Sequence, residues 1–353
     1  MKKGQDHYRG CLLGGAAGDA LGAAVEFLGI DAIREKFGEP GITELQCSES
    51  GYAEITDDTQ MALFTAEGIL RAISRGKERG IWHPSTVIYY AYQRWLVTQG
   101  YSKYEEYDWI YNGWLLGVPG LHAQRAPGNT CLSALLSRKM GTIENPINNS
   151  KGCGGIMRVA PVALALKSLN HDQEFIFQTG AESAAITHGH PSGYLSAGVL
   201  SSIIASILDG LGLHEAVSNV LVILKNYHGH QECSDALLKA IEMADRGLED
   251  FKAIKELGEG WVGEEALAIA VFCALKYSYD YRKAVTASVN HSGDSDSTGS
   301  ITGNILGASL GLSSIPADWL DKLELREVIT RAADDLLTGH RDDEVWWERY
   351  PGF

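Results

Sequence analysis

Apolar residues recur at helical spacing along almost the whole chain. This pattern predicts helices over residues 8–27, 57–73, 84–97, 157–168, 191–208, 214–225, 234–244, 263–277, 281–289, 297–312 and 325–337. There are no repeated runs of alternating β-branched residues, and strands do not alternate with helices. A short strand is conceivable around residues 42–46. The pattern therefore predicts an all-α fold.

The organisation of the chain favours a single domain over residues 1–353. A length of 353 residues allows one large domain or two ordinary ones, at about 100–200 residues each. Clusters of Pro, Gly and Ser are short and fall between the predicted helices, and neither an internal repeat nor a low-complexity tract is present. Apolar residues make up 45% of the chain, which is enough for a substantial core. We expect one compact multi-helix domain.

Two predicted helices carry glycine at every fourth position. The rows consist of Gly10, Gly14, Gly18 and Gly22 in the first helix and Gly299, Gly303, Gly307 and Gly311 in a late one. Each glycine inside a helix costs about 1 kcal/mol relative to alanine, so a row on one face needs a structural reason. Close approach of two helix backbones supplies that reason. The rows indicate that both helices pack centrally, and contact between the two is one arrangement that uses both rows.

Charge and cysteine usage limit the classes of partner. A net charge of −15 opposes non-specific binding to nucleic acid or to an anionic membrane, and it suits metal cations. The six cysteines include no Cys-x-x-Cys pair and are expected to be reduced thiols of a cytoplasmic protein. The N-terminus has no apolar signal segment, and the most apolar stretch, residues 195–213, contains several Ser and Asp209. We expect that stretch to form a buried helix.

Two acidic motifs precede predicted helices. Thr56-Asp57-Asp58 opens one helix and Asp294-Ser295-Asp296-Ser297 opens another. Either motif alone is typical of ordinary helix capping. If the two helix starts converge, however, four carboxylates repel one another unless cations neutralise them. Oxygen ligands of this kind suit Mg²⁺, Mn²⁺ or Ca²⁺ and not zinc, so the pair of motifs predicts a dinuclear metal site.

Six motifs taken together resemble the ADP-ribosylglycohydrolase family, nearest to its ADP-ribosylarginine hydrolase branch, which includes the dinitrogenase reductase-activating glycohydrolases. The motifs are GGAAGDALG at residues 14–22 followed by Glu26, TDDT at 56–59, RAPG at 125–128, GCGGIMR at 152–158, THGHP at 187–191 and GDSDST at 293–298. Their order and approximate spacing match the family from residue 10 to about residue 312.

The resemblance implies an all-helical fold with a binuclear magnesium centre in a cleft. Carried over residue by residue, it implies the metal ligands Thr56, Asp57, Asp58, Asp294, Asp296 and Ser297. It also implies catalytic roles for Glu26, Asp57 and Asp58. Proton transfer to the leaving group falls to Glu26 or to Asp57, and the sequence leaves that choice open. Asp19 is expected to brace the backbone near the metals.

The middle motifs are expected on the nucleotide side of the cleft. The resemblance implies substrate contacts from Gly128, Gly152, Cys153, Gly154, Gly155, His190 and Trp261. Backbone N–H groups of the glycine-rich loop just before a helix form a natural cradle for a pyrophosphate. His190 is expected beside a ribose or phosphate, and Trp261 on the adenosine side. Cys153 stands where many family members have Asn, and it is interpreted as a marker of the arginine branch and not as a nucleophile.

The resemblance implies metal-dependent hydrolysis of the N-glycosidic bond between ADP-ribose and a protein arginine, which reverses mono-ADP-ribosylation. Alternatives within the fold are a serine linkage, O-acetyl-ADP-ribose or ADP-ribosylated nucleic acid. Loss of catalysis is disfavoured because all of the implied metal ligands are present. An antidote protein that also binds and blocks an ADP-ribosyltransferase toxin, as an immunity protein, is a further alternative. Residues 344–350 fit either a partner-contact patch or a tail that packs on its own domain.

Overall fold

A computed structural model describes residues 3–352, and these residues are predominantly helical. About 66% of the structure is helix, and in the described part of the chain there is no strand. Extended pairing is limited to two isolated bridges, Ala53 with Leu323 and Gly152 with Val262. The all-α prediction is confirmed, whereas the short strand considered at residues 42–46 does not form.

The α-helices follow one another along the chain with short connections. They are α1 (Gln5–Gly22), α2 (Ile30–Phe37), α3 (Asp57–Arg79), α4 (Pro84–Thr98), α5 (Asn129–Leu136), α6 (Ala160–Ser168), α7 (Gln173–Ala185), α8 (Pro191–Leu208), α9 (Leu213–Leu224), α10 (Gln231–Asp245), α11 (Asp250–Leu257), α12 (Gly263–Lys276), α13 (Tyr281–Val289), α14 (Ser295–Leu310), α15 (Ala317–Lys322), α16 (Arg326–Thr338) and α17 (Glu344–Arg349). Short 3₁₀ helices occur at η1 (Glu105–Ile110), η2 (Trp114–Gly117), η3 (Pro119–Leu121), η4 (Cys153–Gly155) and η5 (Leu312–Ser314).

Every helix predicted from periodicity is present, with ends that differ by a few residues. The pattern missed α2, α5, α7, α11, α15 and α17. Most of these have six to eight residues, too few for a periodic signal. The exception is α7, which has 13 residues and packs through small side chains. A Cβ built on its Gly180 would lie 3.0 Å from the Ala197 carbonyl oxygen of α8, so close approach of the two helices accompanies the small residues.

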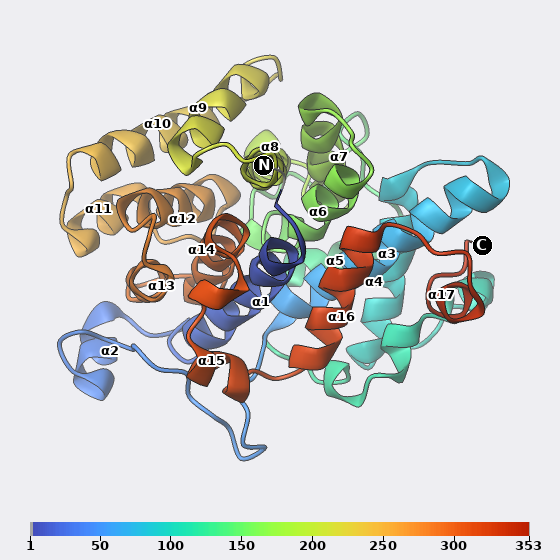
Figure 1. Ribbon diagram of the computed structural model, residues 1–353, viewed down its shortest axis with the longest axis horizontal. Coiled ribbons are helices and arrows are strands. Elements are labelled where there is room, and N and C mark those ends of the chain that lie inside the picture. Colours follow the sequence, from blue (N-terminus) through green and yellow to red (C-terminus); the bar gives the residue numbers. More distant parts are fainter. Residues whose placement is uncertain (1–2, 353) are drawn as a thin grey trace.

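Helices α1 and α14 cross in the middle of the molecule, as the glycine rows indicated (Figure 1). A Cβ built on any glycine of the α1 row would overlap the backbone of α14. The facing pairs are Gly10 with Gly307, Gly14 with Gly303, Gly18 with Gly299, and Gly22 with Ser295. Gly311 ends α14 with a φ of 88°. The crossing brings the end of α1 to the start of α14.

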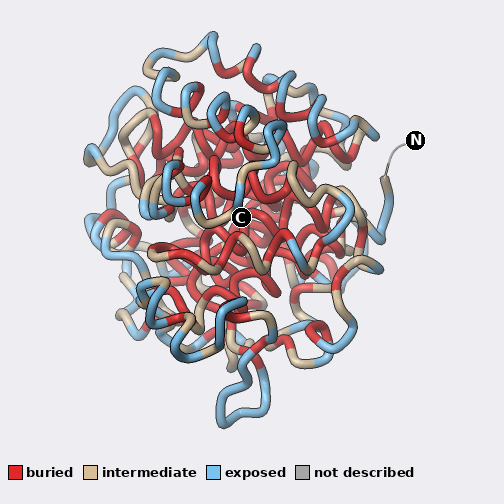
Figure 2. The backbone as a smooth tube through the Cα atoms, turned by 90° about the vertical axis from the view of Figure 1, so that its left-hand side faces the viewer, coloured by how far each residue is buried: buried red, intermediate tan, exposed pale blue. Residues whose placement is uncertain are grey.

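Buried residues fill the centre of the molecule, and exposed residues form its rim (Figure 2). The core helix α8 is long and apolar enough to cross a membrane by length and composition alone, but 94% of that span is buried inside the structure. Core helices of soluble proteins pass the same test. Its burial agrees with the prediction of a buried helix in this segment.

The C-terminal segment packs on its own protein. Trp346 of α17 is buried, and its indole N–H donates to Ser74 Oγ (3.0 Å). The Tyr350 hydroxyl donates to Asp335 Oδ2 (2.9 Å), and the Pro351 carbonyl accepts from Arg71 Nε (3.1 Å). Of the two interpretations of residues 344–350, the docked tail is the one that the structure confirms.

Candidate active site

The two acidic motifs converge on one cleft, as predicted. Asp57 and Asp58 in the first turn of α3 line it together with Asp294 and Asp296 at the start of α14. Glu26, in the turn that follows α1, lines the same cleft and forms a hydrogen bond with Asp296. The cleft has a volume of about 200 Å³ and is open to solvent. The α1–α14 crossing and the start of α3 therefore bring five carboxyl groups together.

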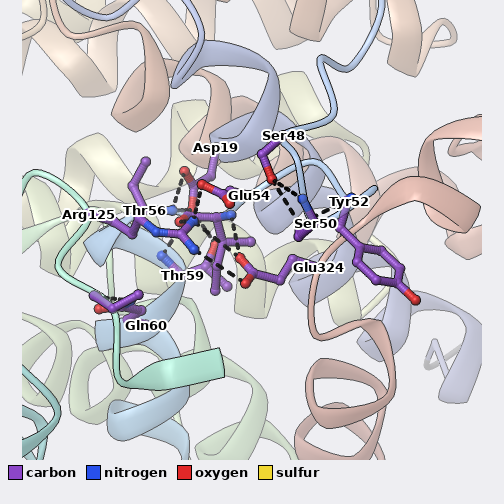
Figure 3. A network of polar contacts seen from close by, with 12 residues as sticks. Asp19, Ser48, Ser50, Tyr52, Glu54, Thr56, Thr59, Gln60, Arg125 and Glu324 are labelled. Atoms are coloured by element: carbon purple, nitrogen blue, oxygen red, sulfur yellow. Dashed lines mark hydrogen bonds and ion pairs between the residues drawn. The ribbon is translucent and has the colours of Figure 1, made fainter. Parts of the chain in front are cut away.

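Asp19 of α1 holds the start of α3 in place. Its carboxylate accepts hydrogen bonds from the N–H groups of Thr56 (3.1 Å) and Thr59 (3.2 Å) and from the Thr59 hydroxyl (Figure 3). Unpaired N–H groups at a helix N-terminus are natural partners for a carboxylate. Asp19 is fully buried and braces the backbone beside the cleft, as the sequence analysis expected.

Arg125 of the RAPG motif anchors the loop opposite α3. Its guanidinium lies 2.8 Å from Glu54 and 3.4 Å from Glu324, and its carbonyl accepts from the Asp57 N–H at 3.3 Å (Figure 3). Further along the motif, the Gly128 N–H donates to Asp57 Oδ2 (3.3 Å). The motif thus fixes one predicted metal ligand from two sides and has a structural role at Arg125.

Capping explains part of each acidic motif but not all of it. Thr56 Oγ1 accepts from the Asp58 N–H (3.2 Å), and Asp294 Oδ1 accepts from the Ser297 N–H (3.2 Å). Capping does not account for the Asp58 side chain, because its Oδ2 is buried and has no hydrogen-bond partner in the described part of the chain. A buried carboxylate oxygen without a partner is costly, and a cation is the natural compensation.

The cleft gathers five carboxyl groups with no lysine or arginine among its described lining residues. Burial, with repulsion from Asp296, raises the pKa values of Asp57, Asp58 and Asp294 well above the usual range. Burial also raises the pKa of Glu26 to about 9, again with repulsion from Asp296. None of the described residues that line the cleft is Lys or Arg. Ionised carboxylates here require positive charge from outside the chain.

The donor set fits a hard divalent cation, although the side chains are not yet arranged around one. Within residues 3–352, no group of three or more His, Cys, Asp or Glu side chains forms a ready-made metal site. Three of the carboxylates instead accept hydrogen bonds from the protein: Asp57 from Gly128, Asp294 Oδ2 from the Cys153 thiol (2.6 Å), and Asp296 Oδ1 from the Ser297 N–H (2.9 Å). Rotation of these side chains would release oxygen ligands of the type that Mg²⁺ or Mn²⁺ prefers.

The structure separates the two predicted hydroxyl ligands. Ser297 lines the cleft, and its Oγ lies 3.7 Å from Cys153 Sγ. Thr56 is buried and does not line the cleft, because its hydroxyl faces the first turn of α3 as a cap. Five of the six predicted ligands therefore share the cleft surface, and Thr56 caps the helix that carries two of them.

The glycine-rich loop offers fewer backbone donors than the sequence predicted. The Gly152 N–H donates to Ser150 Oγ (3.3 Å), and the Cys153 N–H donates to the Trp261 carbonyl (3.1 Å). Gly152, Cys153 and Gly154 line the cleft. Gly155 is buried behind it, where a Cβ would lie 2.9 Å from the Gly193 carbonyl oxygen. The loop residue that lines the cleft without one of these two hydrogen bonds is Gly154, whose N–H is therefore the donor that the loop offers to a ligand.

The THGHP motif presents a different histidine from the one predicted. His190 caps α8, since its Nδ1 accepts from the Ser192 N–H (3.1 Å), and it does not line the cleft. His188 is buried and lines the cleft instead. Burial and the nearby Arg158 lower the pKa of His188 to about 3, so its imidazole is neutral at physiological pH.

Several cleft residues escaped the sequence analysis. Besides His188, these are Ala126, Asn129, Thr130, Cys131 and Met157. Asn129 and Thr130 begin α5, a helix too short to be recognised from periodicity. The signal that could have found them is their position directly after RAPG. Gly128 and Trp261 do line the cleft, as predicted.

The fold and the site define a class of protein. It is a helical protein with an acidic cleft between two helix N-termini and with donor atoms suited to divalent cations. The family model of the ADP-ribosylglycohydrolases matches residues 2–345, and the chain belongs to this family. Members of the family hydrolyse linkages to ADP-ribose.

The chain is similar to named relatives over nearly its full length. The ADP-ribosyl-[dinitrogen reductase] glycohydrolase of Rhodospirillum rubrum is 25% identical and aligns with 94% of this chain and 96% of its own. The ADP-ribosylarginine hydrolase Tri1 of Serratia proteamaculans is 28% identical, with coverages of 94% and 79%. The ADP-ribosylhydrolase ARH3 of Mus musculus is 25% identical, with coverages of 90% and 87%.

A solved structure shares the fold. The structure described as an ADP-ribosylglycohydrolase-related protein complex superposes with a TM-score of 0.62 at 24% identity. The superposition covers 95% of this chain and 98% of the other. This similarity supports the all-helical architecture.

Proposed function

We propose that the protein is a cytoplasmic, Mg²⁺-dependent hydrolase that releases ADP-ribose from ADP-ribosylated arginine in proteins. The observation that carries the proposal is the convergence of Asp57, Asp58, Asp294 and Asp296 in one cleft beside Glu26. The relatives from R. rubrum and S. proteamaculans, one of them named as an ADP-ribosylarginine hydrolase, support the arginine linkage. Six free cysteines suit a reducing compartment.

The aspartates and Ser297 would hold two Mg²⁺ ions, with Mn²⁺ as the alternative. When bound, the ions would supply Lewis acidity that orients the distal ribose hydroxyls and lowers the pKa of a water molecule. The protein's own groups bind and orient the substrate around the anomeric carbon, where positive charge develops as the bond to nitrogen breaks. Glu26 and Asp57 are the two candidates for the transfer of a proton to the leaving guanidine.

Release of ADP-ribose from an arginine-ADP-ribosylated protein tests this proposal directly. We expect release with Mg²⁺ and its loss in excess EDTA, because the cleft carboxylates then lose their counter-ions. A serine-ADP-ribosylated protein, assayed in parallel, reports the linkage. Release from serine alone would move the protein to another linkage within the family, a possibility that similarity to ARH3 favours. Absence of release from both substrates would contradict the proposed hydrolysis of these protein linkages.

Binding of Mg²⁺ is expected to stabilise the folded protein. Cations that bind the native cleft relieve the repulsion among its carboxylates, and a ligand at 100 times its Kd stabilises by about 2.7 kcal/mol. Thermal unfolding with MgCl₂, and with NaCl at equal ionic strength, measures this effect. The variant Asp58→Asn should lose most of the stabilisation, because it replaces the buried carboxylate whose Oδ2 has no partner. Equal stabilisation by the two salts would contradict a specific metal site.

A further inference from the structure

Two aromatic rings stack on each other at the mouth of the cleft. The rings of Phe27 and Trp261 have centroids 6.2 Å apart and an interplanar angle of 20°. Trp261 lines the cleft, and Phe27 directly follows Glu26, which also lines it. The two side chains remain 72% and 40% exposed. Large apolar side chains with this much exposure contribute little to the core, so their pairing beside a cleft points to a ligand.

The backbone on each side of this pair is fixed. The Trp261 carbonyl accepts from the Cys153 N–H (3.1 Å), and nearby the Gly263 N–H donates to the Lys151 carbonyl (2.8 Å). The turn that carries Phe27 is closed by the Leu28 N–H, which donates to the Val25 carbonyl (2.8 Å). Both rings therefore project from tethered segments beside the acidic cleft.

The surroundings select for a planar cation. The face of an aromatic ring attracts a cation within about 6 Å of its centroid, and guanidinium groups stack on such faces because they are flat and weakly hydrated. Carboxyl oxygens accept the N–H groups of a guanidinium, and Glu26, which lines the cleft, directly precedes Phe27 in the chain. No Lys or Arg among the described lining residues competes for these groups.

We propose that Phe27 and Trp261 form an aromatic clamp for the guanidinium of the substrate arginine, and that the clamp sets the preference for the arginine linkage. This inference rests on the proposed function and adds the residues that recognise the leaving group. It assigns Trp261 to the arginine side of the cleft, whereas the sequence analysis expected it on the adenosine side. A serine linkage presents no planar cation and gains nothing from the two rings.

The test separates recognition of arginine from recognition of ADP-ribose. Phe27→Ala and Trp261→Ala are each expected to raise KM for an arginine-ADP-ribosylated protein about tenfold, which corresponds to about 1.4 kcal/mol of lost cation–π interaction. Affinity for free ADP-ribose, which lacks the guanidinium, should change less than about twofold by titration calorimetry. Trp261→Phe keeps a ring and should restore most of the loss. Tyr279→Ala, at a 93% exposed residue outside the cleft lining, is the control for loss of an exposed aromatic ring.

Three results would overturn the clamp. An unchanged KM in both alanine variants would show that the rings do not contact the leaving group. An equal loss of ADP-ribose affinity would assign the rings to the nucleotide. If the wild-type protein releases no ADP-ribose from arginine, this result contradicts the proposed function, and the clamp, which rests on that function, is contradicted as well. Circular dichroism of each variant ensures that a changed KM is not a consequence of misfolding.

Discussion

Replacement of Asp57 and Asp58 by Ala is expected to abolish turnover, with kcat reduced at least about 1,000-fold, or about 4 kcal/mol of transition-state stabilisation. Both side chains are buried in the cleft, and Asp58 Oδ2 has no protein partner. Their loss removes half of the four aspartates proposed to hold the cations. Steady-state release of ADP-ribose from an arginine-ADP-ribosylated protein measures the effect.

The fold of this double variant should survive. Burial and repulsion raise the pKa values of both carboxyl groups, so these groups disfavour the metal-free native state when they are ionised. Their removal should leave the helical circular dichroism intact and the metal-free protein at least as stable. Asp172→Ala is a matched control, because Asp172 caps α7 through the Phe175 N–H (2.8 Å) outside the cleft lining. That variant should lose about 1 kcal/mol of stability and keep its activity. Loss of helical signal in the double variant would make the pair structural.

Long-range features of this fold could be predicted where the sequence repeats a physical constraint. The two glycine rows predicted close contact between two helix backbones. A row of glycines on one helix face is costly unless another backbone packs against that face. The two acidic motifs could be paired for a related reason. Each motif alone is typical of helix capping, and the four carboxylates require cations only if the two helix starts converge. The structure confirms the crossing and the convergence.

Side-chain direction within a motif could not be predicted. His188 and His190 are two residues apart, yet one lines the cleft and the other caps α8. Which of them faces the cleft depends on where α8 begins relative to the glycine-rich loop, and that is a tertiary property. Thr56 is a further case, because its hydroxyl caps α3 and the residue does not line the cleft that its neighbours line. Helix α7 was missed since small residues pack it against α8.

The close contact between α1 and α14 also positions carboxyl groups of the cleft. Gly22 at the end of α1 faces the backbone of Ser295 and Asp296 at the start of α14. This contact positions Asp296 beside Glu26, which follows in the next turn. Any side chain that separates the two helices should therefore disturb stability and the cleft together.

Gly18→Ala is accordingly expected to destabilise the protein by about 3 kcal/mol, against a helix-propensity gain of about 1 kcal/mol. The added methyl group would overlap the Gly299 carbonyl, and backbone cannot yield as the end of a flexible side chain can. Urea unfolding followed by circular dichroism measures the change. Gly76→Ala in α3 is the matched control: its Cβ would lie 3.4 Å from the Trp82 ring, an ordinary contact, so propensity should dominate and stabilise by about 0.5–1 kcal/mol. If Gly18→Ala proved as stable as Gly76→Ala, the crossing could widen at no cost, and close approach would no longer explain the two glycine rows.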